Sequence, residues 1–263
     1  MKAPVAKFSS WTLACVVGIG LAVASGSPAH AQWRYNTYVQ TSAGNYIYTS
    51  AARNYYLTQG LQYRSGRWSL EGNMAFAARD GDSLTVRGSE MMPGSESGHA
   101  AMNLGLGDIF ARASYVLAPQ RNGWPSFTLR ALTKVPTASA ARGLGTGEWD
   151  AGAFLSLARF SGNSYLTAEV GYLWLGDPPG ATYLDPVSYA AGIGRTFVNG
   201  RLGALLLYSG TGKIFAEYEA PRQIGLGLNW RFSQRLGVFT NLARGLSETV
   251  PDFGLSFGFS TAL

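Results

Sequence analysis

Hydrophobic and polar residues alternate along most of the chain. Near its middle, Phe127, Leu129 and Ala131 alternate with Thr128 and Arg130. A repeat of two residues is typical of a β-strand with one apolar face, whereas an amphipathic helix repeats every 3.6 residues. Because the alternation recurs up to the last residues, we predict an all-β fold.

Twelve segments show this pattern and are predicted as strands. They lie near residues 33–41, 54–64, 67–79, 105–117, 127–135, 149–157, 166–174, 186–198, 201–210, 222–232, 235–245 and 252–263. Asn199-Gly200 between two of them is a strong signal for a tight hairpin. In 201–210 both faces are apolar, so the pattern does not say which of Leu205, Leu206 and Leu207 points inward.

The connections between these segments alternate in length. Those at 65–66, 160–163, 199–200 and 233–234 are short and 118–125 is moderate, whereas 42–53, 80–104, 136–147, 176–185, 211–221 and 246–251 are mostly long. Outer-membrane barrels have short periplasmic turns and longer extracellular loops. An even number of strands also places both chain termini on the periplasmic side.

Composition points to a membrane and to strands rather than helices. Charged residues make up 14% of the chain, and 34 residues are glycine. A helical span needs about 18 or more consecutive apolar residues, and no such run follows the N-terminal region. Backbone groups in lipid must all be paired, so a membrane sheet has to close. We therefore predict a transmembrane, antiparallel, up-and-down β-barrel of twelve strands in the bacterial outer membrane.

Residues 1–31 have the features of a secretory signal peptide. Lys2 and Lys7 precede an apolar stretch, and Ala29-His30-Ala31 fits a cleavage site. The alternative is a membrane anchor, for which the apolar stretch is short. Cleavage would leave one domain, 32–263, without its one cysteine and with a net charge of +4 instead of +6. Such a mild and scattered charge does not predict nucleic-acid binding.

Alternation also predicts which side chains meet lipid. The apolar faces should point outward, with aromatic residues near the strand ends forming interfacial girdles. Arg195 falls on an apolar face and is placed near the interface. In the last strand, Phe253, Leu255, Phe257 and Phe259 share one face, similar to the C-terminal signal read by the barrel-assembly machinery. Outer-membrane lipid and this machinery are thus the expected partners.

Charged residues inside strands are the candidate functional residues. By alternation they face the lumen: Arg67, Glu71, Arg79, Arg112, Arg130, Lys134, Asp150, Glu169 and Arg231. A lysine or arginine facing lipid at mid-membrane would cost about 2–4 kcal/mol. Two roles remain open: the charges contact a permeating solute, or opposite charges pair and fill the barrel.

Catalysis and cofactors are not expected. The mature chain has one histidine, His99, in the polar loop 80–104, without the pattern of a nucleophile and base. One histidine and no cysteine argue against a transition-metal site. The glycines of 143–147 precede a strand, which excludes a dinucleotide fingerprint, and 209–213 lacks the glycine and the Ser/Thr of a phosphate loop.

One loop carries a resemblance to a known family. The matching residues are Lys134-Val135-Pro136-Thr137, then Gly143-Leu144-Gly145-Thr146-Gly147 and Asp150. This loop resembles the signature of outer-membrane proteins linked to the meta-pathway of phenol degradation. A second family feature is similar to Leu106-Gly107-Asp108. The resemblance implies a barrel for passive uptake of small hydrophobic or aromatic compounds, without catalytic residues. The alternative is a non-transporting barrel with a role in envelope structure or surface interaction.

Overall fold

The structure is a computed structural model and describes residues 32–44, 52–80, 84–87, 90–93 and 103–263. The predicted signal peptide, Cys15 and His99 lie outside the described residues. The strands are β1 (Gln32–Gly44), β2 (Ala52–Ser65), β3 (Trp68–Asp80), β4 (Leu84–Arg87), β5 (Glu90–Pro93), β6 (Asn103–Leu106), β7 (Ile109–Ala118), β8 (Ser126–Val135), β9 (Asp150–Ser161), β10 (Ser164–Leu175), β11 (Val187–Phe197), β12 (Leu202–Thr211), β13 (Arg222–Arg231), β14 (Leu236–Gly245) and β15 (Phe253–Ala262). No helix in this part of the chain is long and apolar enough to cross a membrane.

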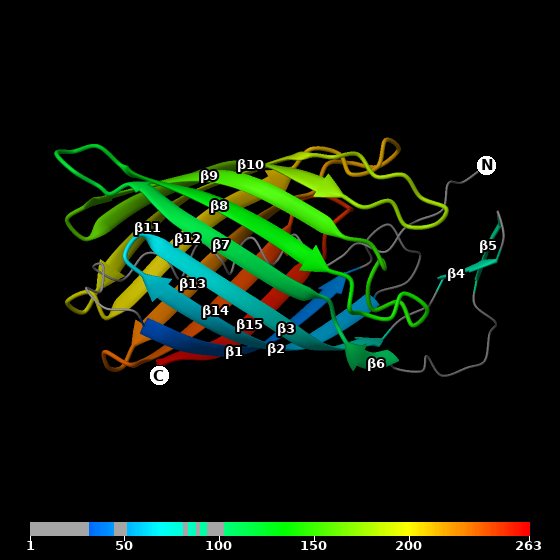
Figure 1. The fold of residues 1–263 in the computed structure, drawn as a ribbon, viewed down its shortest axis with the longest axis horizontal. Helices are drawn as coiled ribbons and strands as arrows, with labels where there is room; N and C mark the ends of the chain where they lie inside the picture. Colours follow the sequence, from blue (N-terminus) through cyan, green and yellow to red (C-terminus); the bar gives the residue numbers. More distant parts are fainter. Residues whose placement is uncertain (1–31, 45–51, 81–83, 88–89, 94–102) are drawn as a thin grey trace.

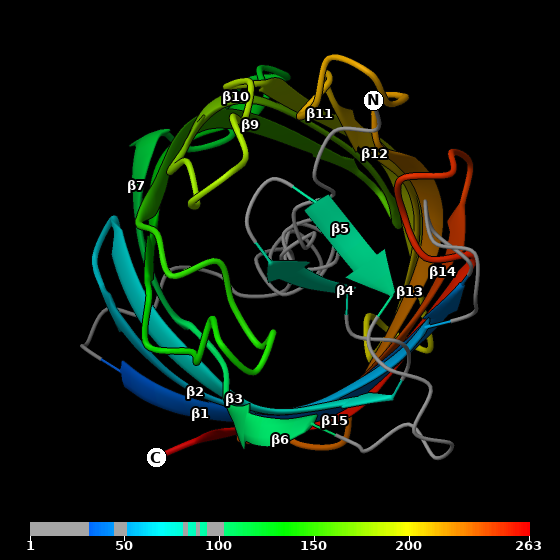
Figure 2. The same ribbon diagram turned by 90° about the vertical axis from the view of Figure 1, so that its right-hand side faces the viewer.

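Twelve of the strands close into a barrel, as predicted. Each pairs antiparallel with its neighbours in sequence, β7 takes the place after β3, and β1 pairs with β15 to complete the ring. Figure 1 shows the tilted strands from the side, and Figure 2 shows the closed wall seen from the end with the long loops. Closure leaves the wall without an edge, which is what lipid requires of a sheet.

The region around 80–106 differs from the prediction of one loop followed by one strand. β4 and β5 form a short separate hairpin within it, beyond the end of the barrel (Figure 1). The predicted strand 105–117 is two strands, since β6 and β7 are separated by Gly107 and Asp108. β6 and β7 both pair with β3, but only β7 pairs with β8. The interruption turns Asp108 out of the ladder and toward the loop that follows β8.

The two faces of the wall follow the predicted alternation. In β15, Phe253 and Phe257 are exposed on the outside, whereas Ser256 and Ser260 are buried on the inside. The same rule decides β12, where Leu206 faces outward and is 44% exposed, while Leu205 and Leu207 point inward and are 4% and 2% exposed. Two inward leucines are unusual for a lumen wall, which explains why the sequence pattern left this strand undecided.

Aromatic residues mark both rims of the outer surface. At the periplasmic end, Trp33 packs against Tyr63 and Trp68 against Tyr115, with ring centroids 4.9 and 4.7 Å apart. Tyr172 and Trp174 lie at the opposite end, 5.1 Å apart. Amphipathic rings at two levels with an apolar band between them are typical of a membrane barrel. The periplasmic turn expected at Asn199-Gly200 is present and spans the four residues from Val198 to Arg201.

Candidate functional site: the lumen wall

Six of the predicted candidates lie on inward faces and form three ion pairs. Glu71 pairs with Arg112 at 3.1 Å, Arg130 with Glu169, and Lys134 with Asp150 at 2.5 Å. The other two candidates of the described wall, Arg67 and Arg231, are exposed at the periplasmic rim, where they donate to backbone carbonyl groups. The side chain of Arg79 lies outside the described part. Paired charges inside the barrel therefore come from strands β3, β7, β8, β9 and β10.

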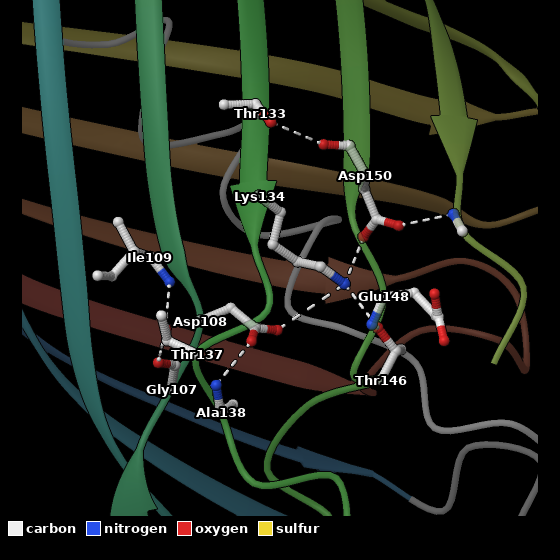
Figure 3. A network of polar contacts seen from close by, with 11 residues as sticks. Gly107, Asp108, Ile109, Thr133, Lys134, Thr137, Ala138, Thr146, Glu148 and Asp150 are labelled. Carbon is white, nitrogen blue, oxygen red and sulfur yellow. Dashed lines mark hydrogen bonds and ion pairs between the residues drawn. The ribbon is translucent and has the colours of Figure 1, made fainter.

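Lys134 is the centre of the most buried of these groups (Figure 3). Its side chain is fully buried at the end of β8, and its ammonium group lies 2.5 Å from Asp150 Oδ2 and 3.8 Å from Asp108 Oδ2. It also donates to Thr146 Oγ1 at 2.7 Å. Two carboxylates and a hydroxyl thus surround the ammonium group of Lys134. These partners offset the free-energy cost of burying its positive charge.

The loop between β8 and β9 is tied to the wall at its start by a second set of bonds. The Thr137 hydroxyl donates to the carbonyl of Gly107 at 3.0 Å and accepts from the amide of Ile109 at 3.0 Å. The amide of Ala138 donates to Asp108 Oδ1 at 3.0 Å. Because Lys134 holds Thr146 near the other end of the loop, the segment 136–149 folds over the mouth of the barrel (Figure 2). We call the group of Asp108, Lys134, Thr146 and Asp150 the Lys134 cluster.

The conformation and close packing of the β8–β9 loop explain the glycines of 143–147. Gly143 and Gly147 have positive φ angles of 72° and 80°, which glycine adopts without strain. A Cβ atom on Gly145 would lie 2.7 Å from Ala138 Cβ and 2.9 Å from Asp108 Oδ2. The motif therefore shapes a loop that approaches Asp108 closely and presents Thr146 to Lys134.

Arg130 and Glu169 form the second group, deeper in the lumen. They lie two strands apart, with β9 between them. The Ser156 hydroxyl donates to Glu169 Oε2 at 2.5 Å, and the guanidinium carbon of Arg130 lies 4.6 Å from the centroid of the Phe154 ring. Arg130 Nε has no hydrogen-bond partner among the described residues. A buried charged donor of this kind is available to water or to a polar solute group.

Glu71 and Arg112 form the third group, which borders a cavity. The cavity has a volume of about 50 Å³ and is also lined by the rings of Tyr38, Tyr56 and Phe110. Arg112 Nε is buried without a hydrogen-bond partner in the described part of the chain. An aromatic lining with one acidic and one basic group can contact both the ring and the polar substituent of a small molecule. An apolar cavity known to hold benzene measures about 150 Å³, so a monoaromatic solute needs side chains here to move.

Apolar side chains also line the lumen, which the sequence analysis did not predict. Leu132, Phe154 and Leu173 form a buried inward cluster, against which Phe110 and Leu175 pack. A second inward cluster combines Tyr165 with Ala190, Leu205 and Leu207. The inward faces of β8 to β10 therefore carry both charged and apolar residues, and those of β11 and β12 add Ala190, Leu205 and Leu207. Small inward residues are seen on β15, whereas β1 and β2 also carry Tyr38 and Tyr56 on the inward face.

Asp108 and Thr146 are the functional candidates that sequence reasoning missed. In the sequence Asp108 stands out only as part of a Leu-Gly-Asp pattern, and Thr146 only as a member of the glycine-rich loop. The sequence signal for both is the same: each lies in a family-like motif that no strand pattern explains. Their roles depend on the fold of the loop, which alternation does not describe.

The closed twelve-stranded wall, its apolar outer band and its aromatic girdles define an integral β-barrel of the bacterial outer membrane. Residues 24–263 match the family model described as "Putative MetA-pathway of phenol degradation", and the chain belongs to this family. The suspected resemblance is thereby confirmed.

Solved structures share the fold at low sequence identity. An outer membrane channel from Pseudomonas putida F1 has a TM-score of 0.64 at 15% identity, over 92% of this chain and 98% of that chain. The translocator domain of the autotransporter NalP from Neisseria meningitidis has a TM-score of 0.53 at 10% identity, covering 99% of both chains. The transport unit of the autotransporter AIDA-I from Escherichia coli has a TM-score of 0.51 at 10% identity, over 95% and 96% of the two chains. No curated protein sequence matches this chain significantly.

Proposed function

We propose that the barrel is a channel for passive uptake of small hydrophobic or aromatic molecules. The observation that carries this proposal is the inward cluster of Leu132, Phe154 and Leu173 beside the Arg130–Glu169 pair. General porins have a polar, water-filled interior. Apolar side chains in the lumen wall instead favour solutes whose transfer out of water costs little free energy. The adjacent charges favour solutes with one polar group.

Three further points support the proposal. The family description refers to phenol degradation, and phenol combines an aromatic ring with one hydroxyl group. The similar barrel from Pseudomonas putida F1 is described as an outer membrane channel, which agrees with the expectation that the chain is not an enzyme. The rings of Tyr38, Tyr56 and Phe110 around the Glu71–Arg112 pair provide a second place with the same chemistry.

The test is uptake by proteoliposomes of labelled phenol and, in parallel, of a small sugar. We expect phenol to enter faster than the sugar. Phe154→Ala should lower the phenol-to-sugar ratio about two- to tenfold, since an aromatic contact contributes about 0.5–1.5 kcal/mol. Leu155→Ala is the matched control, because Leu155 is the next residue of β9 and faces outward with 42% exposure. Heat-modified mobility in gels verifies that each variant is folded.

Equal entry of both solutes into wild-type vesicles would show a general pore and refute the selectivity. Entry of neither solute would support the second candidate, a non-transporting barrel with an envelope or surface role. One observation favours this candidate: the six predicted candidates on inward faces are joined in three ion pairs, as expected if pairing fills the barrel.

The expected partners other than the solute are also part of the proposal. Strand β15 presents Phe253, Phe257 and Phe259 on its outer face, and this pattern supports recognition by the barrel-assembly machinery. The exposed apolar band supports contact with outer-membrane lipid.

A further inference from the structure

The outer surface of the barrel has a groove on its extracellular half. It has a volume of about 450 Å³ and crosses β12 to β15 and β1. Most of its side chains are apolar, among them Leu206, Ile224, Leu226, Leu242 and Leu255. Thr41 and Ala43 of β1 are the small residues beside the larger Phe253 and Leu255 of β15. A long apolar depression in a lipid-facing wall has the shape and chemistry to hold an acyl chain.

A cationic group lies at the extracellular end of this groove. Arg244 is exposed on the outer face of β14, and its guanidinium carbon lies 4.2 Å from the centroid of the Phe253 ring. No ion pair within the described residues joins Arg244 to a carboxylate. Phe253 therefore orients a guanidinium group whose donors remain available to an anion, and guanidinium binds phosphate in a bidentate manner.

A second arginine lies on the same level of the wall. In the strand register Arg244 faces Phe253, Phe253 faces Ala43, and Ala43 faces Arg53. Arg53 is also exposed, and three strand spacings of about 4.8 Å place it roughly 14 Å from Arg244 along the wall. Arg244 is the better defined anion ligand of the two, because Phe253 orients its guanidinium group.

We propose that this groove binds a phosphorylated glycolipid of the outer leaflet. An acyl chain occupies the groove, Arg244 binds a phosphate on the sugar headgroup, and Arg53 is placed for a second phosphate. The position favours this ligand because the lining residues lie in the middle and extracellular parts of β1 and β12 to β15, at the level of the outer leaflet. Among the other described charges at this end of the wall, Glu219 and Arg222 form an ion pair with each other at 3.5 Å, and Glu248 and Asp252 belong to the loop between β14 and β15.

The wall provides a matched control at its opposite end. Arg195 of β11 is exposed on the outer face, and its guanidinium carbon lies 5.8 Å from the ring of Phe197. This pair has the same composition as Arg244 and Phe253 but lies at the periplasmic end, level with the other leaflet. A general attraction of arginine for anionic lipid would involve both pairs, whereas the proposed site involves only Arg244.

The experiment is a titration of the full-length mature barrel in detergent micelles, followed by native mass spectrometry. The probes are a diphosphorylated glucosamine-disaccharide glycolipid, the same glycolipid without phosphates, and phosphatidylglycerol. We expect the phosphorylated glycolipid to bind at least tenfold more tightly than either comparator. Arg244→Gln should weaken its binding about tenfold, the effect of one lost charge-assisted hydrogen bond, and Arg195→Gln should change it less than twofold.

Leu242→Trp tests the groove without altering a charge. The larger ring should fill the groove and reduce binding of the phosphorylated glycolipid while leaving the barrel folded, since the side chain faces outward with 49% exposure. Equal binding of all three lipids, or equal losses in the Arg244 and Arg195 variants, would overturn the proposal. Neither result depends on what passes through the lumen.

Discussion

Replacing Lys134 with methionine removes the charge at the centre of the Lys134 cluster while keeping most of the side-chain volume. The lysine is fully buried, 2.5 Å from Asp150 and 3.8 Å from Asp108. Without it, two buried carboxylates lie close together with no cation between them. Breaking a buried ion pair by removing one partner costs about 3–5 kcal/mol.

This cost translates into a measurable change in melting temperature. For a chain of 150–250 residues, 1 kcal/mol corresponds to about 2–4 °C, so Lys134→Met should melt about 10 °C below wild type. The assay is the temperature at which the folded band disappears in gel electrophoresis, checked by circular dichroism in detergent. Lys213→Met is the control, because Lys213 is exposed and donates to the backbone carbonyl of Ala216.

A combined variant separates charge from packing. Adding Asp108→Asn and Asp150→Asn to Lys134→Met removes all three charges together, and replacing a whole buried ionic group is often nearly neutral. We therefore expect the triple variant to recover at least half of the lost stability. If Lys134→Met melts within 2 °C of Lys213→Met, the cluster does not hold the loop and the reasoning is wrong.

Two further predictions concern the loop and the lipid face. Gly145→Ala should destabilise the barrel by about 1–3 kcal/mol, because its Cβ would lie 2.9 Å from Asp108 Oδ2. Gly72→Ala is the control in the same melting assay and should have little effect, because its Cβ would have no heavy atom within 4 Å. Equal shifts in melting temperature for the two variants would contradict the close approach of Gly145 to Asp108. Val170→Arg on the outer face of β10 should cost about 2–4 kcal/mol in urea unfolding from lipid vesicles, whereas Val187→Arg at the end of β11 should cost about 0–1 kcal/mol. Equal costs at the two valines would contradict the placement of the membrane.

The fold could be predicted because its main determinant, the alternation of apolar and polar residues, is visible within each short segment of the sequence. A strand with one face in lipid must alternate with period two, and each of the twelve barrel strands does so closely enough to be found. Strand β12 shows where this fails: with leucine on both faces, burial of Leu205 and Leu207 depends on Tyr165 of β10, two strands away. The alternation of residues within β12 does not predict this contact between strands.

The candidate site could be predicted only in part. Charge inside a strand identified Lys134, Asp150, Arg130 and Glu169, and the structure pairs them. The role of Asp108 is not predicted, since it arises where the segment paired with β3 is interrupted between β6 and β7. The inward Phe154 was not identified either, because an apolar residue on a lumen face looks like an irregularity until its neighbours Leu132 and Leu173 are known.

The pairing of β1 with β15 has a consequence for how the chain reaches its native state. Arg34 lies opposite Ala262, about 230 positions away, and this ladder completes the ring. Until the last strand arrives, the backbone donors and acceptors of β1 on that side have no partner, which lipid does not tolerate. Insertion of separate, already folded segments is therefore disfavoured, and the chain must be kept unfolded until its final strand is available. The pairing of β1 with β15 is the slowest contact to form because it closes the longest loop.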